Sequence, residues 1–274
     1  MAKQTIGFIG LGDMGGPMAA RLLEHGYRVL SCVHRRRETM EKLKSKGIVE
    51  KRNPREVAAE CDILMSIVVD QDQTEHVLRG PDGVLAALRP GSTIIVMSTL
   101  APAYVQALAA ELATTRIELI DCPVSGGPMG AEKGTLALIA GGGPEVIERC
   151  RAPLETMGTI NNCGPTGMGM VAKLANNSVA LLTVPLIQEA RAMAASYGVD
   201  MDTLMSVMRN GTANSFIVQS WKWVEEYGEK GAPVALKDLR LCQQAAAAKN
   251  VPTVMLDAHL AKECVQTAAN TKSS

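Results

Sequence analysis

The segment Thr5-Ile-Gly-Phe-Ile-Gly10-Leu-Gly-Asp-Met-Gly15 decides the fold of this chain of 274 residues. It joins an apolar, strand-like run to a GxGxxG pattern, and an amphipathic helix is predicted next, over residues 14–25. In such a unit Gly10 permits a tight turn, Gly12 lets the backbone approach a pyrophosphate, and Gly15 lets the helix pack on the strand. The helix N-terminus attracts the anion. We therefore expect a dinucleotide to bind along this loop, at Gly10, Leu11, Gly12, Asp13, Met14 and Gly15.

Strand-like and helical segments alternate through the first 160 residues. The predicted strands lie at 5–10, 27–33, 62–69, 93–97, 117–120 and 135–140, and the predicted helices at 14–25, 38–46 and 102–112. Continuous apolar runs of this length are typical of strands buried on both faces. The alternation therefore predicts an α/β Rossmann domain with a mostly parallel sheet over residues 1–164.

The pattern changes after Gly169. Residues 170–197 are rich in Ala, Leu and Met and predict one long helix, which can kink at Pro185. Further helices are predicted at 202–208, 216–226, 234–249 and 253–269, with glycine and proline at the breaks. We therefore predict an all-α C-terminal domain over residues 165–274, joined to the first domain by a long interdomain helix.

Composition narrows the class of protein. The 28 Lys and Arg balance the 28 Asp and Glu, which disfavours a nucleic-acid partner. The seven cysteines and four histidines show no CxxC, HxH or HExxH spacing, so we expect no metal site and mostly core cysteines. The first residues lack a secretory signal pattern, and no uninterrupted apolar run reaches the length of a membrane span. We expect a cytoplasmic protein without a membrane partner.

The end of the second predicted strand bears on the choice between NAD and NADP. An NAD site usually places an acidic residue about 20 residues beyond the glycine loop, on the ribose 2′-hydroxyl. This chain has His34-Arg35-Arg36-Arg37 there, and a guanidinium can bind a 2′-phosphate through two hydrogen bonds. We expect NADP(H) to be preferred and NAD(H) to be possible, with Arg35 the first candidate, followed by Arg36 and His34. A solvated basic helix start is the alternative interpretation.

Four further stretches follow in the chain: Met97-Ser98-Thr99 with Pro102, Asp121-Cys-Pro-Val-Ser125-Gly126-Gly127-Pro-Met-Gly-Ala-Glu-Lys-Gly134-Thr135-Leu, Gly164-Pro-Thr-Gly167-Met-Gly169-Met-Val-Ala-Lys173-Leu-Ala-Asn176-Asn177, and Lys237-Asp238-Leu. Together with the glycine loop they resemble the β-hydroxyacid dehydrogenase family, which includes 3-hydroxyisobutyrate dehydrogenase and tartronate semialdehyde reductase. The matches occur in family order and cover almost the whole chain. The resemblance implies hydride transfer between a nicotinamide cofactor and a small β-hydroxy acid, its semialdehyde or a keto acid.

The resemblance also implies roles for single residues. Lys173 would be the general acid and base, and Asn177 would orient the reacting oxygen. Lys237 and Asp238 would line the cofactor end of the cleft, where Asp238 can pair with a lysine. Substrate binding would fall to Ser125, Gly126, Gly127 and Thr99, and further cofactor contacts to Val68, Val69 and Thr99.

The spacing and chemistry of these residues are consistent with the roles that the resemblance implies. Lys173 and Asn177 are four positions apart on a predicted helix, so they share a face. Partial desolvation on an apolar helix would lower the pKa of a lysine and suit it to proton transfer near neutrality. Without the resemblance, Lys173 would be interpreted as a surface residue. The Ser125–Gly127 segment can hold a carboxylate as a backbone nest does, or be an ordinary strand-ending turn.

Three rival functions remain at this point. A decarboxylating enzyme of the 6-phosphogluconate type shares the fold and the lysine, but the helical half shows no obvious phosphate-binding cluster. An imine reductase shares the architecture and typically lacks the lysine. A non-catalytic NADP-binding sensor or scaffold tends to lose it too. The substrate stays open, and a long Ala/Leu/Met helix favours a homodimer or homotetramer.

Overall fold

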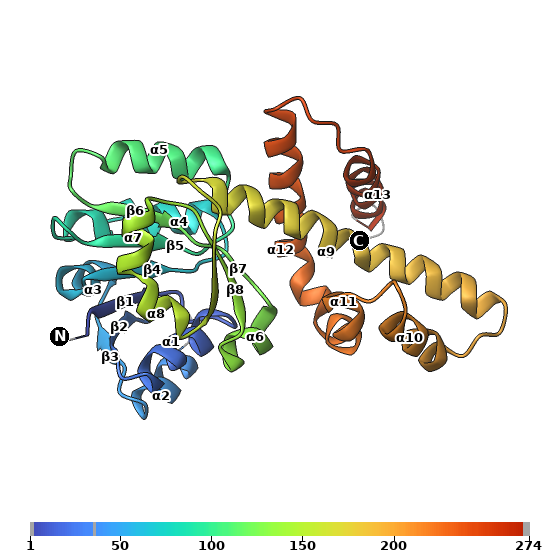
Figure 1. The fold of residues 1–274 in the computed structure, drawn as a ribbon, viewed down its shortest axis with the longest axis horizontal. Helices are drawn as coiled ribbons and strands as arrows, with labels where there is room; N and C mark the ends of the chain where they lie inside the picture. The colour runs from blue at the N-terminus through green and yellow to red at the C-terminus, as the bar shows by residue number, and fades with distance from the viewer. Residues whose placement is uncertain (1–2, 35–36, 271–274) are drawn as a thin grey trace. The chain divides into compact units, whose positions relative to one another are not determined.

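The structure is a computed structural model that describes residues 3–34 and 37–270, the last eight of these without their side chains. It divides into two units, Met1–Lys173 and Leu174–Ser274, here called the sheet unit and the helical unit (Figure 1). The long helix α9 (Met168–Ser196) contributes residues to both.

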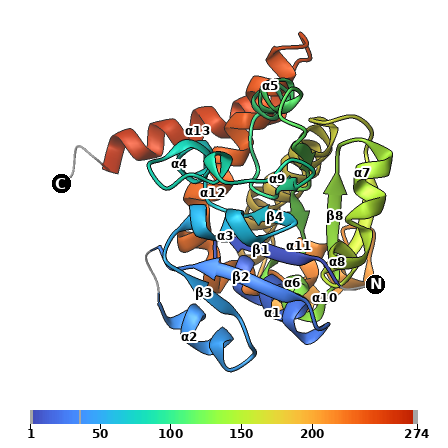
Figure 2. The same ribbon diagram turned by 90° about the vertical axis from the view of Figure 1, so that its left-hand side faces the viewer.

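The sheet unit contains a six-stranded, fully parallel sheet in the order β3-β2-β1-β4-β5-β6. Figure 2 shows β3, β2, β1 and β4 side by side. This is the doubly wound order of dinucleotide-binding domains, so the Rossmann prediction is confirmed. The sequence missed only the short strand β3 in this sheet. The strands are β1 (Thr5–Ile9), β2 (Arg28–Cys32), β3 (Val49–Lys51), β4 (Ile63–Ser66), β5 (Thr93–Val96) and β6 (Glu118–Asp121).

Helices cover both faces of this sheet because successive strand side chains point to opposite faces. On β4, Ile63 and Met65 join one core and Leu64 joins the other. The first core includes residues of α1 (Gly15–Glu24) and α2 (Glu38–Lys44), and the second includes residues of α3 (Pro54–Glu60), α4 (Gln71–Arg79), the 3₁₀ turn η1 (Val84–Ala86) and α5 (Pro102–Leu112). Cys32, Cys61 and Cys122 are buried as predicted, while Cys163 is half-buried.

A second, three-stranded sheet corrects one expectation. The segment predicted as a strand at 135–140 does not continue the main sheet: β8 (Leu136–Ala140) pairs antiparallel with β7 (Val124–Ser125) and parallel with β9 (Gly158–Asn162). Pro123 follows β6 closely and cannot donate a ladder hydrogen bond, which explains why the chain leaves the first sheet here. The helices of this region are α6 (Gly127–Lys133), α7 (Pro144–Arg149) and α8 (Arg151–Glu155).

The helical unit confirms the prediction of an all-α region. After α9 come α10 (Met201–Asn210), α11 (Phe216–Gln219), α12 (Trp221–Ala247) and α13 (Val254–Asn270). One core gathers around buried Trp221, and a second forms where Leu239 of α12 packs with Leu256 and Leu260 of α13.

The predicted break between residues 226 and 234 is wrong. Helix α12 continues through Gly228, Gly231 and Pro233, and the break falls at Ser220 instead. A proline inside a helix removes one backbone hydrogen bond, and packing along the rest of a 27-residue helix can offset that loss. Pro185 likewise lies inside α9.

Helix α9 is unusually long and apolar. Among the described residues it is the one helix whose length and composition would suffice to cross a membrane. A single helix of this kind is weak evidence, because core helices of soluble proteins pass the same test. It carries polar residues in its first half, including Lys173, Asn176 and Asn177.

Candidate active site

The glycine loop joins β1 to α1 as the sequence predicts. Gly10 has a φ of +101°, and a Cβ there would lie 2.0 Å from the Ile67 carbonyl oxygen. A Cβ on Gly15 would lie 1.8 Å from the Gly10 carbonyl oxygen. Helix α1 has no acidic residue in its first turn, and no described side chain caps its N-terminus. These features fit a nucleotide pyrophosphate, because the backbone approach is open at Gly12 and the first turn of α1 carries no acidic side chain.

The other predicted cofactor residues of the sheet unit lie at the edge of the main sheet where the strands end, which is also where the glycine loop lies. All six strands are parallel, so their carboxyl ends share one edge of the sheet. Val68 and Val69 follow β4, Thr99 follows β5, and His34 follows β2. The Val68 N–H donates to Ser98 Oγ at 2.8 Å, which links the loops after β4 and β5. Ligands of open α/β sheets bind at this edge, where the strand order reverses beside β1.

The end of β2 holds the residues expected to choose the cofactor. His34 is exposed, and its ring lies 6.5 Å from that of His76 on α4. Arg35 and Arg36 lie outside the described residues. Arg37 is paired with Glu41 and Glu50, at 2.9 Å each, and so stabilises the start of α2.

The Ser125–Gly127 segment is a strand-to-helix junction rather than the turn after β6 that the sequence suggested. Ser125 ends β7, Gly126 precedes α6, and Gly127 begins that helix. Gly126 and Gly127 have φ values of +129° and +64°, which non-glycine residues rarely adopt. Both glycines and Ser125 are half-buried. Helix α6 packs against α1, whose first residue belongs to the glycine loop.

Helix α9 carries the predicted catalytic residues. Lys173 is 8% exposed and belongs to the sheet unit; Asn177, one turn later, is 9% exposed and belongs to the helical unit. The Asn177 Nδ2 donates to Asp238 Oδ2 of α12 at 2.7 Å, and its Oδ1 accepts from Asn176 Nδ2 at 3.2 Å. The Asn177 amide is therefore held in one orientation.

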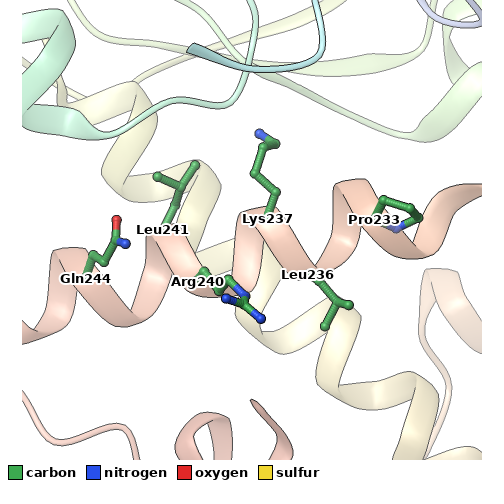
Figure 3. Close-up of a pocket in the computed structure, with 6 residues that line it drawn as sticks. All are labelled: Pro233, Leu236, Lys237, Arg240, Leu241 and Gln244. Atoms are coloured by element: carbon green, nitrogen blue, oxygen red, sulfur yellow. The ribbon is translucent and has the colours of Figure 1, made fainter. Parts of the chain in front are cut away.

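The KD pair lies on α12. Asp238 is 5% exposed, and its Oδ1 lies 2.8 Å from the Nζ of Lys237, its neighbour in the chain. Lys237 lines a shallow hollow of about 420 Å3 along α12, with Arg240 and four other residues of the same helix (Figure 3). The Asp238 carboxylate, which contacts both Asn177 and Lys237, connects α9 and α12 within the helical unit.

Sequence reasoning assigned no role to three polar residues in this region. Ser98 is buried and receives the Val68 N–H. His76 faces His34. Asp121, at the end of β6, is fully buried, and burial raises the pKa of its carboxyl group, although backbone hydrogen bonds from Gly167 and Met170 oppose the rise. Among the described residues, no group of three or more His, Cys, Asp or Glu side chains could hold a metal ion.

Two family models match consecutive parts of the chain. Residues 5–169 match the NAD binding domain of 6-phosphogluconate dehydrogenase. Residues 167–274 match the NAD-binding region of NADP-dependent 3-hydroxyisobutyrate dehydrogenase. Together they span both units.

Individual proteins resemble the chain over most of its length. The 2-hydroxy-3-oxopropionate reductase of Escherichia coli K12 is 33% identical over 266 residues, which cover 94% of this chain and 90% of the relative. The NAD-dependent L-serine dehydrogenase of Pseudomonas aeruginosa PAO1 is 32% identical over 264 residues, 92% of this chain and 88% of the relative. The solved structure of Mycobacterium tuberculosis 3-hydroxyisobutyrate dehydrogenase with L-serine has a TM-score of 0.81 and 29% identity, covering 98% of this chain and 94% of that one.

The sheet order, the glycine loop, the family models and these relatives agree in one assignment. The chain belongs to the β-hydroxyacid dehydrogenase family of NAD(P)-dependent oxidoreductases.

Proposed function

We propose that this chain is an NADP-preferring oxidoreductase that interconverts a small β-hydroxy acid and its semialdehyde or keto acid, with Lys173 as the general acid and base. Residues 1–164 would bind the cofactor, and residues 165–274 would complete the substrate site and the subunit interface. The observation that carries the proposal is the burial of Lys173 one helical turn from an Asn177 amide that Asp238 holds in place.

The carboxyl edge of the main sheet supports the cofactor part of this proposal. A Cβ on Gly12 would meet nothing within 4 Å, so the backbone there is accessible, and the first amides of α1 can donate to the pyrophosphate. No acidic side chain follows β2 where an NAD site would usually carry one. Arg35 and Arg36 are the guanidinium groups proposed to bind a 2′-phosphate.

The cofactor, when bound, supplies the hydride acceptor or donor. Lys173 takes the hydroxyl proton while hydride leaves the hydroxyl-bearing carbon, so that a carbonyl group forms. In the reverse direction the protonated amine gives its proton to the carbonyl oxygen as hydride arrives at carbon. Asn177 donates to or accepts from the same oxygen and orients it, and a carboxylate of the substrate binds Ser125 and the amides of Gly126 and Gly127.

The relatives support the substrate class. The names of the Escherichia coli and Pseudomonas aeruginosa relatives denote a three-carbon hydroxy semialdehyde acid and a three-carbon hydroxy amino acid. The proposed substrate is therefore a small carboxylic acid with a hydroxyl or carbonyl group on its β-carbon. The cytoplasm is the proposed location.

Exposed side chains on α9 support a homo-oligomer. Val179, Leu186 and Met193 are 71%, 53% and 63% exposed, and they recur at seven-residue intervals on one helix. Such an apolar stripe favours burial against a second copy. A homodimer or homotetramer is the proposed state, and light scattering after size-exclusion chromatography measures it.

The substrate and cofactor are tested together by absorbance at 340 nm. Short semialdehydes are supplied with NADPH and NADH side by side, and the matching hydroxy acids with NADP⁺ and NAD⁺. We expect turnover with at least one semialdehyde and a higher kcat/KM with NADPH. Binding of NADPH without turnover of any compound would favour a sensor, release of carbon dioxide from 6-phosphogluconate would favour the decarboxylating class, and reduction of cyclic imines alone would favour an imine reductase.

The cofactor preference has its own variant. Replacing Arg35 by Ala removes a proposed guanidinium partner of the 2′-phosphate and should weaken NADPH binding by about tenfold or more, while NADH binding changes little. Titration of protein fluorescence with each cofactor measures both constants. Arg37→Ala is the matched control, because Arg37 is already paired with Glu41 and Glu50. Equal losses for the two cofactors in Arg35→Ala would contradict the assignment.

A further inference from the structure

One fully buried carboxyl group takes no part in the function proposed above. Asp121 is the last residue of β6, and its side chain is 0% exposed. A carboxyl group removed from water destabilises the fold unless hydrogen-bond donors replace the lost water. Both of its oxygens have such donors, and both donors belong to the start of α9.

The two hydrogen bonds are short and come from backbone groups. The Gly167 N–H donates to Asp121 Oδ1 at 2.7 Å, and the Met170 N–H donates to Asp121 Oδ2 at 2.7 Å. The first N–H groups of a helix have no partner within the helix, and a negative charge there also interacts favourably with the helix dipole. Asp121 thus caps α9 from a strand that lies far away in the sequence.

The surrounding glycines close the backbone around this carboxyl group. A Cβ on Gly169 would lie 2.8 Å from Asp121 Oδ2 and 2.4 Å from the Ile139 carbonyl oxygen, and a Cβ on Gly141 would lie 2.6 Å from Asp121 Oδ1. The backbones of Asp121 and Gly141 also exchange two hydrogen bonds, of 3.0 and 2.7 Å. The start of α9 is therefore held against both sheets without room to slide.

Lys173 follows the capped residue Met170 by three positions, less than one helical turn. Helical side chains tilt toward the N-terminus of their helix, so the long Lys173 side chain leans toward the capped end of α9. Rotation or translation of the first turn would carry the amine with it. Because all these residues belong to the sheet unit, the relation does not depend on the helical unit.

We propose that Asp121 is a positioning residue for the Lys173 amine, fixing the register of α9 against β6 and placing a carboxyl group at the start of the helix that carries that amine. The inference rests on the proposed role of Lys173. Among the described residues, the thiols of Cys122 and Cys163 are titratable neighbours of Asp121, and burial raises the pKa of both, so they stay uncharged near neutral pH. The carboxyl group of Asp121, which accepts a backbone N–H at each oxygen, is the charge-bearing group proposed here.

Asp121→Asn tests the inference in the direction of alcohol oxidation. The amide keeps the volume but turns an NH2 group toward one of the two backbone donors and removes the charge. We expect kcat to fall by about tenfold or more while the dissociation constant of the cofactor stays within about twofold. We also expect the acidic limb of the kcat–pH profile to move to lower pH by up to about one pH unit, because loss of the negative charge disfavours the protonated amine.

Two further variants separate position, charge and stability. Gly169→Ala pushes α9 away from β6 but keeps the carboxylate, so kcat should fall without the pH shift. Asp200→Asn removes a helix cap elsewhere, where the Thr203 N–H donates to Asp200 Oδ1 at 2.8 Å at the start of α10. It should lower Tm and leave kcat and its pH profile unchanged. Hydrogen exchange of the first amides of α9 should speed up in Asp121→Asn and stay unchanged in Asp200→Asn.

The outcomes distinguish this inference from the proposed function. If Lys173→Ala loses turnover while Asp121→Asn keeps the wild-type kcat and pH profile, the inference is overturned and the proposed function stands. If Asp121→Asn lowers Tm alone, Asp121 is only a structural cap and the inference is again overturned. If Lys173→Ala keeps its turnover, both fail. Should Asp121→Asn not fold, a wild-type kcat in Gly169→Ala would still overturn the inference.

Discussion

The three glycines of the loop after β1 are needed for different physical reasons. Backbone oxygens of Ile67 and Gly10 occupy the space that a Cβ on Gly10 or Gly15 would need. A Cβ on Gly12, in contrast, would meet nothing within 4 Å. The fold therefore requires glycine at the first and third positions, whereas a bound pyrophosphate is the proposed reason for glycine at the second.

Gly12→Ala should separate cofactor binding from stability. We expect its Tm to match that of the wild type, because the methyl group enters open space, and its affinity for NADPH to fall by about tenfold or more. Thermal melts without cofactor and a fluorescence titration with NADPH measure the two quantities. Gly10→Ala is the control and should lose stability even without cofactor. An unchanged NADPH affinity in Gly12→Ala would place the pyrophosphate elsewhere.

Single residues were predictable from sequence where their role is local. The glycine loop and the shared face of Lys173 and Asn177 follow from spacing along one segment. The role of Asp121 depends on donors at Gly167 and Met170, more than forty residues later. No local pattern encodes such a contact, so the sequence placed Asp121 in a motif without a reason for it.

At the scale of elements, α12 is the informative case. It runs for 27 residues through Gly228, Gly231 and Pro233, where the sequence predicted a break. Gly228 is exposed, and a Cβ there would meet nothing within 4 Å. Glycine inside a helix has greater freedom in the unfolded chain than alanine and so weakens the helix.

Gly228→Ala should stabilise the protein by about 0.5–1 kcal/mol if α12 is continuous. We expect Tm to rise by a few degrees in a thermal melt followed by circular dichroism. Gly198→Ala is the matched control: its Cβ also meets open space, but its φ of +80° disfavours alanine, so Tm should fall. A lower Tm for Gly228→Ala would indicate a turn at that position.

Elements were predictable where hydrophobic period and flanking residues agree. Helix α5 was predicted with both ends correct, since Pro102 starts it and apolar residues repeat at helical spacing. The helix breaks were wrong at α12 because glycine and proline are local signals, while the packing of α12 on α13 is a tertiary one. Short elements such as β3 and α8 offer too few residues for a periodic pattern.

At the scale of the whole molecule, surface charge links stability to pH. Among the described residues, hydrogen bonds from lysine or arginine side chains hold the pKa of five carboxyl groups below the ordinary value of 4.5, those of Glu24, Glu50, Glu56, Glu60 and Glu225. A lowered pKa means that the folded state favours the charged form. This stabilisation is present above the unfolded pKa and is lost as pH falls through the folded values. The pKa of Asp121 is raised, so its contribution to the pH dependence of stability has the opposite sign.

Acidification should therefore lower Tm once the pH falls below about 4.5. Salt at about 0.5 M should reduce the dependence, because exposed ion pairs are screened. Thermal melts between neutral and acid pH measure how Tm changes with pH. In the double variant Glu50→Gln with Glu60→Gln, Tm should fall less steeply with decreasing pH than in the wild type. An equal slope in that variant would mean that other groups control acid stability.

The overall fold was largely predictable because a βαβ alternation and a helical second half are properties of long segments. The parallel sheet and the all-α region follow from them. The second sheet was not predictable from the sequence. Its strand β7 has only two residues, and β7 pairs with β8, a strand that could equally have extended the first sheet.

The most direct test of the whole account is the rate of NADPH oxidation by Lys173→Ala, measured at 340 nm with the semialdehyde that the wild type turns over. The account predicts a rate lower by a factor of about 10²–10⁴, with NADPH binding and Tm close to wild type, because only proton transfer is removed. A Lys173→Ala variant that binds NADPH and turns over at the wild-type rate would contradict it.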